Sequence, residues 1–126
     1  MTNKIKKSIA GIIAVTSFTT ALVGISTNAI ELRSSTARKT FDGCTCELYV
    51  NQTQANAGIY TAGNIKSVLS ANVYNIGGNV TDNSGHTIVK RNASSAWANT
   101  YGKNFEGASA SYGTENGSTY MSKNVD

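Results

Sequence analysis

The stretch Cys44–Asn51, which reads CTCELYVN, decides the fold class of this chain. Its side chains alternate between two kinds, because a polar or amphipathic residue separates each small or apolar residue from the next. A period of two is typical of a β-strand that buries one face and exposes the other. We therefore predict a half-buried strand whose inner positions are Cys44, Cys46, Leu48 and Val50.

The alternation recurs towards the C-terminus. Residues 67–76 predict a second strand, with Leu69, Ala71 and Val73 on the inner face. Residues 52–64 read as a loop or a short strand. Further strands are predicted over 87–91, 94–101, 108–112 and 118–122, with turns at 77–78, 83–85, 102–104 and 115–117. Short consecutive strands joined by tight turns predict an all-β fold, a small antiparallel β-sandwich or meander.

The composition agrees with this class. The chain has no proline and 12 glycines, and only 14% of its residues are charged. Its turns must therefore be formed by glycine and asparagine, which tolerate positive φ angles. Helix bundles usually carry many glutamates and lysines on their surfaces. The composition thus favours polar β-faces over a helical bundle.

The N-terminus predicts export. Lys4, Lys6 and Lys7 precede an uncharged, largely apolar stretch over residues 9–25, and Thr27-Asn28-Ala29 offers the small residues that a signal peptidase recognises. The stretch is shorter than the roughly 20 apolar residues of a spanning helix and is diluted by threonine and serine, which argues against an uncleaved anchor. A second candidate cleavage position follows Ala37.

These features divide the chain into three parts and predict a secreted protein with no stable membrane span after cleavage. We expect a cleaved signal peptide over residues 1–29, a flexible arm or pro-segment over 30–43, and a single small β domain over 44–126.

The charge outside the predicted signal is close to balanced. Three of the 11 basic residues lie within the signal, so eight remain against seven acidic residues. A protein that follows a phosphate backbone needs a clustered basic patch. Nucleic acid is therefore not an expected partner.

The inventory of reactive side chains favours a protein that is not an enzyme. His86 is the only histidine, and it lies in a polar turn. The spacing of the carboxylates singles out no pair for acid–base work. A tetrahedral metal site would lack ligands, since Cys44 and Cys46 are the only cysteines. We predict no catalytic residues, cofactor or metal.

Cys44-Thr45-Cys46 nevertheless has several readings. In an oxidising compartment the two thiols could pack in the core, close a structural disulfide, pair with other chains or carry redox chemistry. A disulfide across so small a ring would constrain little of the unfolded chain.

Two segments carry a family resemblance: SANVYN at residues 70–75, and WANTYGKN at 97–104 leading to GASASY at 107–112. Over about residues 67–122 the chain resembles the lactococcin 972 family of secreted, unmodified bacteriocins from Gram-positive bacteria. The resemblance implies a small antiparallel β-sandwich and an antibacterial toxin that binds a cell-wall precursor at the target surface without turnover. The chain departs from the pattern at Cys44-Thr45-Cys46, in its longer N-terminal part and in its polar C-terminus.

Aromatic residues are the candidate contacts for any such ligand. Trp97, the only tryptophan, is expected in the core, because its neighbours Ala96 and Ala98 are small. A second class of function is a non-catalytic secreted binding or envelope-associated protein, and a third is a membrane-active toxin. A homo-oligomer is also open. The candidate binding or core aromatics are Tyr74, Trp97, Tyr101 and Tyr112.

Overall fold

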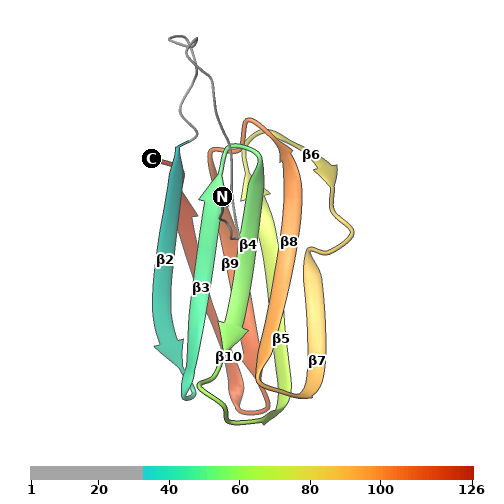
Figure 1. The fold of residues 1–126 in the computed structure, drawn as a ribbon. Helices are drawn as coiled ribbons and strands as arrows, with labels where there is room; N and C mark the ends of the chain where they lie inside the picture. The colour runs from blue at the N-terminus through green and yellow to red at the C-terminus, as the bar shows by residue number, and fades with distance from the viewer. Residues whose placement is uncertain (1–32) are drawn as a thin grey trace, which may run out of the picture. The chain divides into compact units, whose positions relative to one another are not determined.

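A computed structural model describes residues 33–126, which form an all-β domain without helices in that range (Figure 1). Two antiparallel sheets lie face to face, as expected for a β-sandwich. The predicted signal peptide over residues 1–29 and the first residues of the predicted arm lie outside the described range. Within residues 33–126 no helix is long and apolar enough to cross a membrane.

The first sheet has five strands. Its spatial order is β2-β3-β4-β8-β6, and every neighbouring pair is antiparallel. Its strands are β2 (Ser34–Phe41), β3 (Cys44–Asn51), β4 (Gln54–Tyr60), β8 (Ser95–Lys103) and β6 (Asn79–Asp82).

The second sheet has four strands in the order β10-β9-β5-β7, again all antiparallel. Between β4 and β9 the chain changes sheet at every connection, so only β2-β3-β4 and β9-β10 follow one another as neighbours. The domain is therefore a β-sandwich and not a simple meander. The strands are β10 (Gly117–Asn124), β9 (Gly107–Thr114), β5 (Lys66–Ile76) and β7 (Thr87–Ala93).

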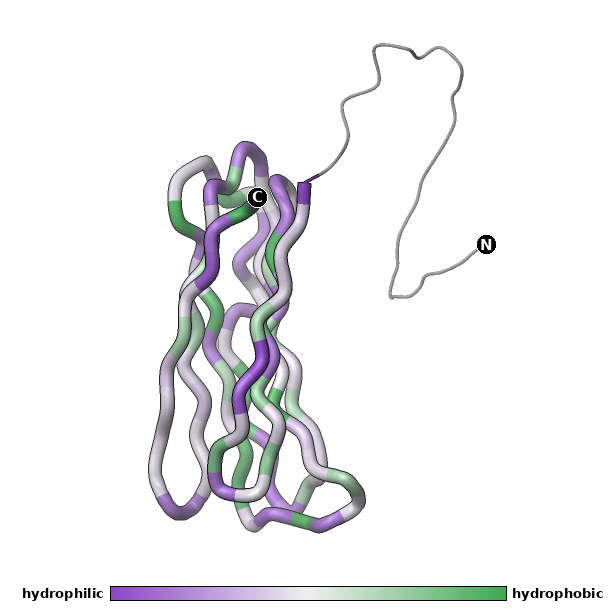
Figure 2. Tube along the Cα trace, turned by 90° about the vertical axis from the view of Figure 1, so that its left-hand side faces the viewer, coloured by the Kyte–Doolittle hydropathy of each residue, from purple (hydrophilic) through white to green (hydrophobic). Residues whose placement is uncertain are grey.

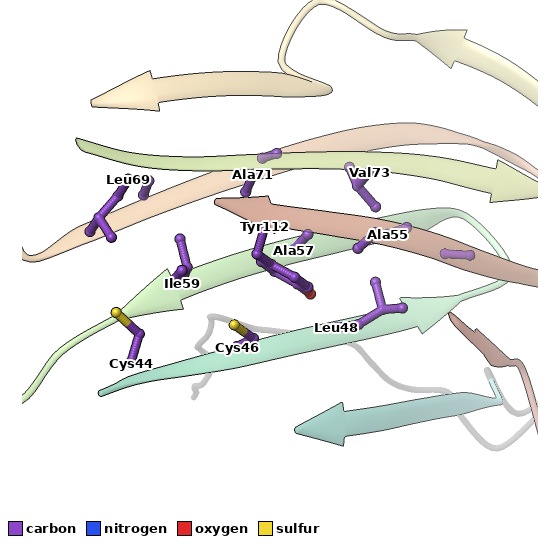
Figure 3. Close-up of a cluster of buried hydrophobic side chains, with 14 of the residues drawn as sticks. Cys44, Cys46, Leu48, Ala55, Ala57, Ile59, Leu69, Ala71, Val73 and Tyr112 are labelled. Atoms are coloured by element: carbon purple, nitrogen blue, oxygen red, sulfur yellow. The ribbon is translucent and has the colours of Figure 1, made fainter. Parts of the chain in front are cut away.

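The core lies between the inner faces of the two sheets. Figure 3 shows side chains from β3, β4, β5 and β9 pointing towards one another in this space. The alternation predicted for β3 and β5 is confirmed, because the seven inner side chains named above are all almost fully buried. Figure 2 shows hydrophobic residues spread along the strands in short stretches, as this alternation requires.

Tyr112 is the largest fully buried side chain of the core. Its hydroxyl donates a hydrogen bond to the backbone carbonyl of Glu47 in the opposite sheet, with 2.5 Å between the oxygens. Burial of the phenol raises its pKa far above the usual value. Of the four candidate aromatics, Tyr112 is therefore a core residue that joins the two layers.

The flexible arm predicted over residues 30–43 is wrong for most of its length. Ser34–Phe41 forms the edge strand β2, and Asp42 and Gly43 make the tight turn to β3. An edge strand covers little of the core, so its inner positions need few apolar residues. Here they are Ser35, Ala37, Lys39 and Phe41, and only Phe41 packs against the core cluster.

Of two further strands, β4 confirms the short-strand alternative for residues 52–64, and β6 was not predicted. Residues 52–64 contain the central strand β4, whose inner residues Ala55 and Ala57 are too small to give a strong apolar signal. β6 is a four-residue edge strand that is exposed throughout and contains a bulge. In the structure β4 pairs with β3 and β8, and β6 pairs with β8.

Candidate functional site

Trp97 lies on the surface, and its predicted place in the core is wrong. Its side chain is on the outer face of β8, and the residue is 42% exposed, while Ala96 and Ala98 are buried. Successive residues of a strand point to opposite faces. Ala96 and Ala98 therefore leave space on the core side of the sheet, whereas the indole lies on the opposite side.

The indole lies flat on the sheet because the residue beside it has no side chain. Gly58 of β4 is paired with Trp97 in the antiparallel register. A Cβ atom added to Gly58 would lie 2.4 Å from two carbons of the indole ring, well inside van der Waals contact. The ring thus covers the β4 backbone, a packing by which aromatic residues commonly protect glycines in sheets.

Tyr60 extends this aromatic patch along β4. Its ring centroid lies 5.8 Å from that of Trp97, and the two ring planes are only 15° apart. Tyr60 follows Gly58 by two residues, so both lie on the outer face. The two rings therefore form a stacked pair with nearly parallel planes.

A polar chain supports Tyr60 from the next strands. The Tyr60 hydroxyl donates to Glu47 Oε1 at 3.1 Å, and Arg38 Nε donates to the same oxygen at 3.1 Å. The nearby Glu47 carboxylate raises the pKa of Arg38. Burial, and then Glu47, raise the pKa of Tyr60. The charges of Arg38 and Glu47 therefore balance one another within the sheet.

Neutral polar side chains flank the rings. Asn56 of β4 and Asn99 of β8 are register partners in the row next to Trp97, and Tyr49 of β3 completes that row. Tyr101 and Gln54 are partners one row further along. We call this outer surface of the five-stranded sheet the aromatic face, comprising Arg38, Glu47, Tyr49, Gln54, Asn56, Gly58, Tyr60, Trp97, Asn99 and Tyr101.

The structure divides the four predicted aromatics among three places. Trp97 and Tyr101 share the aromatic face, and Tyr101 is 41% exposed. Tyr74 lies on the outer face of the other sheet, where it is 49% exposed and contacts the His86 ring at a centroid distance of 5.2 Å. Tyr112 lies in the core. Gly58 was not predicted as a site residue, because the sequence shows there only a glycine within a possible short strand.

The two cysteines are free thiols in the core. Burial raises the pKa of both, that of Cys46 to about 11. The described residues contain no group of three histidine, cysteine or acidic side chains that could hold a metal. In this arrangement Cys44 and Cys46 act as small hydrophobic residues.

Comparisons with protein-family models, with curated proteins and with solved structures gave no match. The chemistry of the candidate site is therefore read from its geometry. The aromatic face offers flat stacking area, hydrogen-bond donors and acceptors, and one internally neutralised ion pair.

Proposed function

We propose that the protein is a secreted, non-catalytic binding protein with antibacterial action, and that the aromatic face is its recognition surface for a component of the target cell surface. The observation that carries the proposal is the placement of Trp97. It is the only tryptophan of the chain, and it is exposed while held flat against Gly58 and beside Tyr60.

A fixed aromatic ring is well suited to recognition. Tryptophan and tyrosine supply a large contact area at little cost in conformational entropy, and residues of these types dominate binding energy at interfaces. The alternative is a purely structural role, in which Trp97 only covers the β4 backbone. Shielding alone does not require an exposed ring, whereas Trp97 is 42% exposed and Tyr101, on the same face of the sheet, is 41% exposed.

The antibacterial part of the proposal is supported by the resemblance to secreted bacteriocins. The resembling segment at residues 97–104 contains Trp97, Asn99 and Tyr101, three members of the aromatic face. Binding at the surface of other bacteria would then require no turnover.

Binding to intact cells tests the proposal. The secreted protein is incubated with a panel of Gram-positive strains, and we measure the fraction that sediments with the cells and the growth of each strain. Trp97→Thr keeps a residue suited to strands and removes the ring. Tyr74→Ala is the matched control, since it removes an equally exposed aromatic from the opposite sheet.

We expect Trp97→Thr to lose cell binding and growth inhibition with its melting temperature nearly unchanged, and Tyr74→Ala to keep both activities. Undiminished binding by Trp97→Thr would overturn the assignment of the face. Binding without inhibition of any strain would reject the antibacterial role and leave the alternative, a secreted or envelope-associated binding protein.

A further inference from the structure

We infer that the ligand of the aromatic face is a neutral polysaccharide chain, bound along its length on an open surface. This inference rests on the proposed function, because it names the class of ligand for the same face. Three properties of the face support it: its charge, its hydrogen-bonding groups and its flatness.

The charge of the face argues against an anionic ligand. Trp97 lies in a four-strand row with Arg38, Glu47 and Gly58, and the two adjoining rows contain Thr36, Tyr49, Asn56 and Asn99, and Thr40, Thr45, Tyr60 and Ser95. Arg38 and Glu47 are the only charged residues in these rows, and they bind one another. A phosphate-bearing ligand is recognised by clustered cationic donors, and these rows offer only Arg38, whose charge is neutralised by its ion pair with Glu47.

The hydrogen-bonding groups fit a ligand rich in hydroxyls. The rows beside Trp97 carry two carboxamides and several hydroxyls, all of them uncharged. A carboxamide both donates and accepts, and so does each sugar hydroxyl. The Asn99 carboxamide therefore matches the edge of a sugar ring that rests on the neighbouring indole, whereas the Asn56 Oδ1 atom is buried away from a ligand.

The flatness of the face selects the stacking partner. A pyranose ring has one side formed mainly by C–H groups, and these carry partial positive charge that complements the negative face of an aromatic ring. The Trp97 indole packs over Gly58, and the Tyr60 ring stacks with it at an angle of 15° between the two planes. A globular protein partner would instead need a larger apolar patch with a desolvated centre.

The face also predicts how the chain is bound. The two rows that adjoin the Trp97 row contain no charged residue, whereas Asp82 pairs with Tyr101 in the row beyond and Lys103 follows at the end of β8. Internal segments of a polymer can therefore lie across the uncharged rows. Affinity should then rise with the number of sugar units, and a single sugar should bind poorly.

Because Trp97 is the only tryptophan, its fluorescence reports directly on the site. The secreted protein is first tested for retention on insoluble chitin and cellulose and for sedimentation with phosphatidylglycerol vesicles. It is then titrated with N-acetylglucosamine and with its soluble β-1,4-linked tetramer, in low salt and in about 0.5 M sodium chloride, which screens charge–charge contacts.

We expect retention on at least one polysaccharide, no vesicle binding, and a fluorescence change with the tetramer that salt does not weaken. Trp97→Thr should reduce retention at least about tenfold, and Tyr74→Ala should leave it unchanged. Arg38→Gln should also leave vesicle binding absent.

Two outcomes separate this inference from the proposed function. Suppose that cell binding requires Trp97 but the protein is not retained on a polysaccharide, or binds vesicles in a salt-sensitive way. That result would overturn the assignment of a neutral glycan as the ligand and would keep the aromatic face as the recognition surface. Cell binding that does not require Trp97 would overturn both.

Discussion

The missing side chain of Gly58 fixes the orientation of the indole above it. Any Cβ at this position must displace Trp97 or the β4 backbone, because it would lie 2.4 Å from the ring carbons. Gly58 is therefore a packing requirement of the site, although its φ angle is not in the left-handed region.

Gly58→Ala should lift the indole from the sheet. We expect a shift of the tryptophan emission towards that of a solvated indole and a loss of about 1–3 kcal/mol in unfolding free energy, the usual cost of overpacking. Emission spectra and urea denaturation measure the two effects. Gly85→Ala is the control, since its added Cβ would meet only Asn99 O at an ordinary 3.6 Å. Identical spectra for Gly58→Ala and the wild type would contradict the flat packing.

The buried thiols give a second prediction at this scale. Cys44 and Cys46 have raised pKa values and almost no exposed surface, and thiolates are the reactive form. Near pH 8 the folded protein should therefore react with a thiol reagent far more slowly than the protein in guanidinium chloride, where both thiols should react.

The pH dependence of stability follows from the same shift. Because the folded pKa of Cys46 lies above its unfolded value of 9.0, the unfolded chain releases its proton first as the pH rises. The contribution of Cys46 to stability is complete below pH 9 and is lost as the pH rises towards 11.

In the labelling experiment, rapid reaction of the native protein with the thiol reagent would contradict the burial of Cys44 and Cys46.

At the scale of the strands, β2 is the element whose role most needs a test. It completes one edge of the five-stranded sheet, and the Lys39 ammonium group donates to the backbone carbonyl of Tyr120 in β10 at 3.3 Å. This contact joins the edges of the two sheets. Phe41 adds apolar contact with the core.

A chain that begins at residue 44 should therefore be defective. It exposes the edge of β3, and unpaired edges promote association. We expect a melting temperature below that of the full secreted protein and aggregation visible by size-exclusion chromatography. Lys39→Met, which keeps β2 and removes the ammonium group, is the milder comparison. Equal thermal stability of the shortened chain would show that β2 is dispensable.

Alternating residues allowed β3, β5, β8 and β9 to be predicted from the sequence. The same pattern could not say which face of β8 turns inward, because alanines and aromatics are both acceptable core residues. Small inner residues left β4 undecided between a loop and a short strand, and polar inner residues concealed β2. The pairing of Gly58 with Trp97 depends on a register between strands distant in the sequence.

At the scale of the whole domain, Asp42 connects three segments at one end of the sandwich. Its Oδ2 atom accepts hydrogen bonds from Thr114 Oγ1 at 2.6 Å, Asn116 Nδ2 at 3.0 Å and Lys66 Nζ at 3.2 Å. These donors, led by Thr114, lower the pKa of Asp42. The carboxylate thus joins the β2–β3 turn to β5 and to the β9–β10 hairpin.

Because the folded pKa of Asp42 is lowered, the contribution of this group to folding stability should decrease in acid. The contribution of Asp42 to stability is present above its unfolded pKa of 3.8 and is lost as the pH falls through the lower folded value. Asp42→Asn should therefore reduce stability at neutral pH and flatten the dependence of melting temperature on pH below about 4. Thermal unfolding across this range measures it. Asp126→Asn, at the exposed C-terminal residue, should retain the wild-type slope.

The repeated crossing of the chain between the two sheets has a kinetic consequence. From β4 to β9 each new strand joins the layer opposite its predecessor, so its pairing partners are distant in the sequence. Chains with such non-local pairing close long loops before they gain contacts, and they fold in milliseconds to seconds rather than microseconds. Because the chain has no proline, prolyl isomerisation adds no slower step. The formation of non-local strand pairs alone therefore determines the rate at which the aromatic face forms.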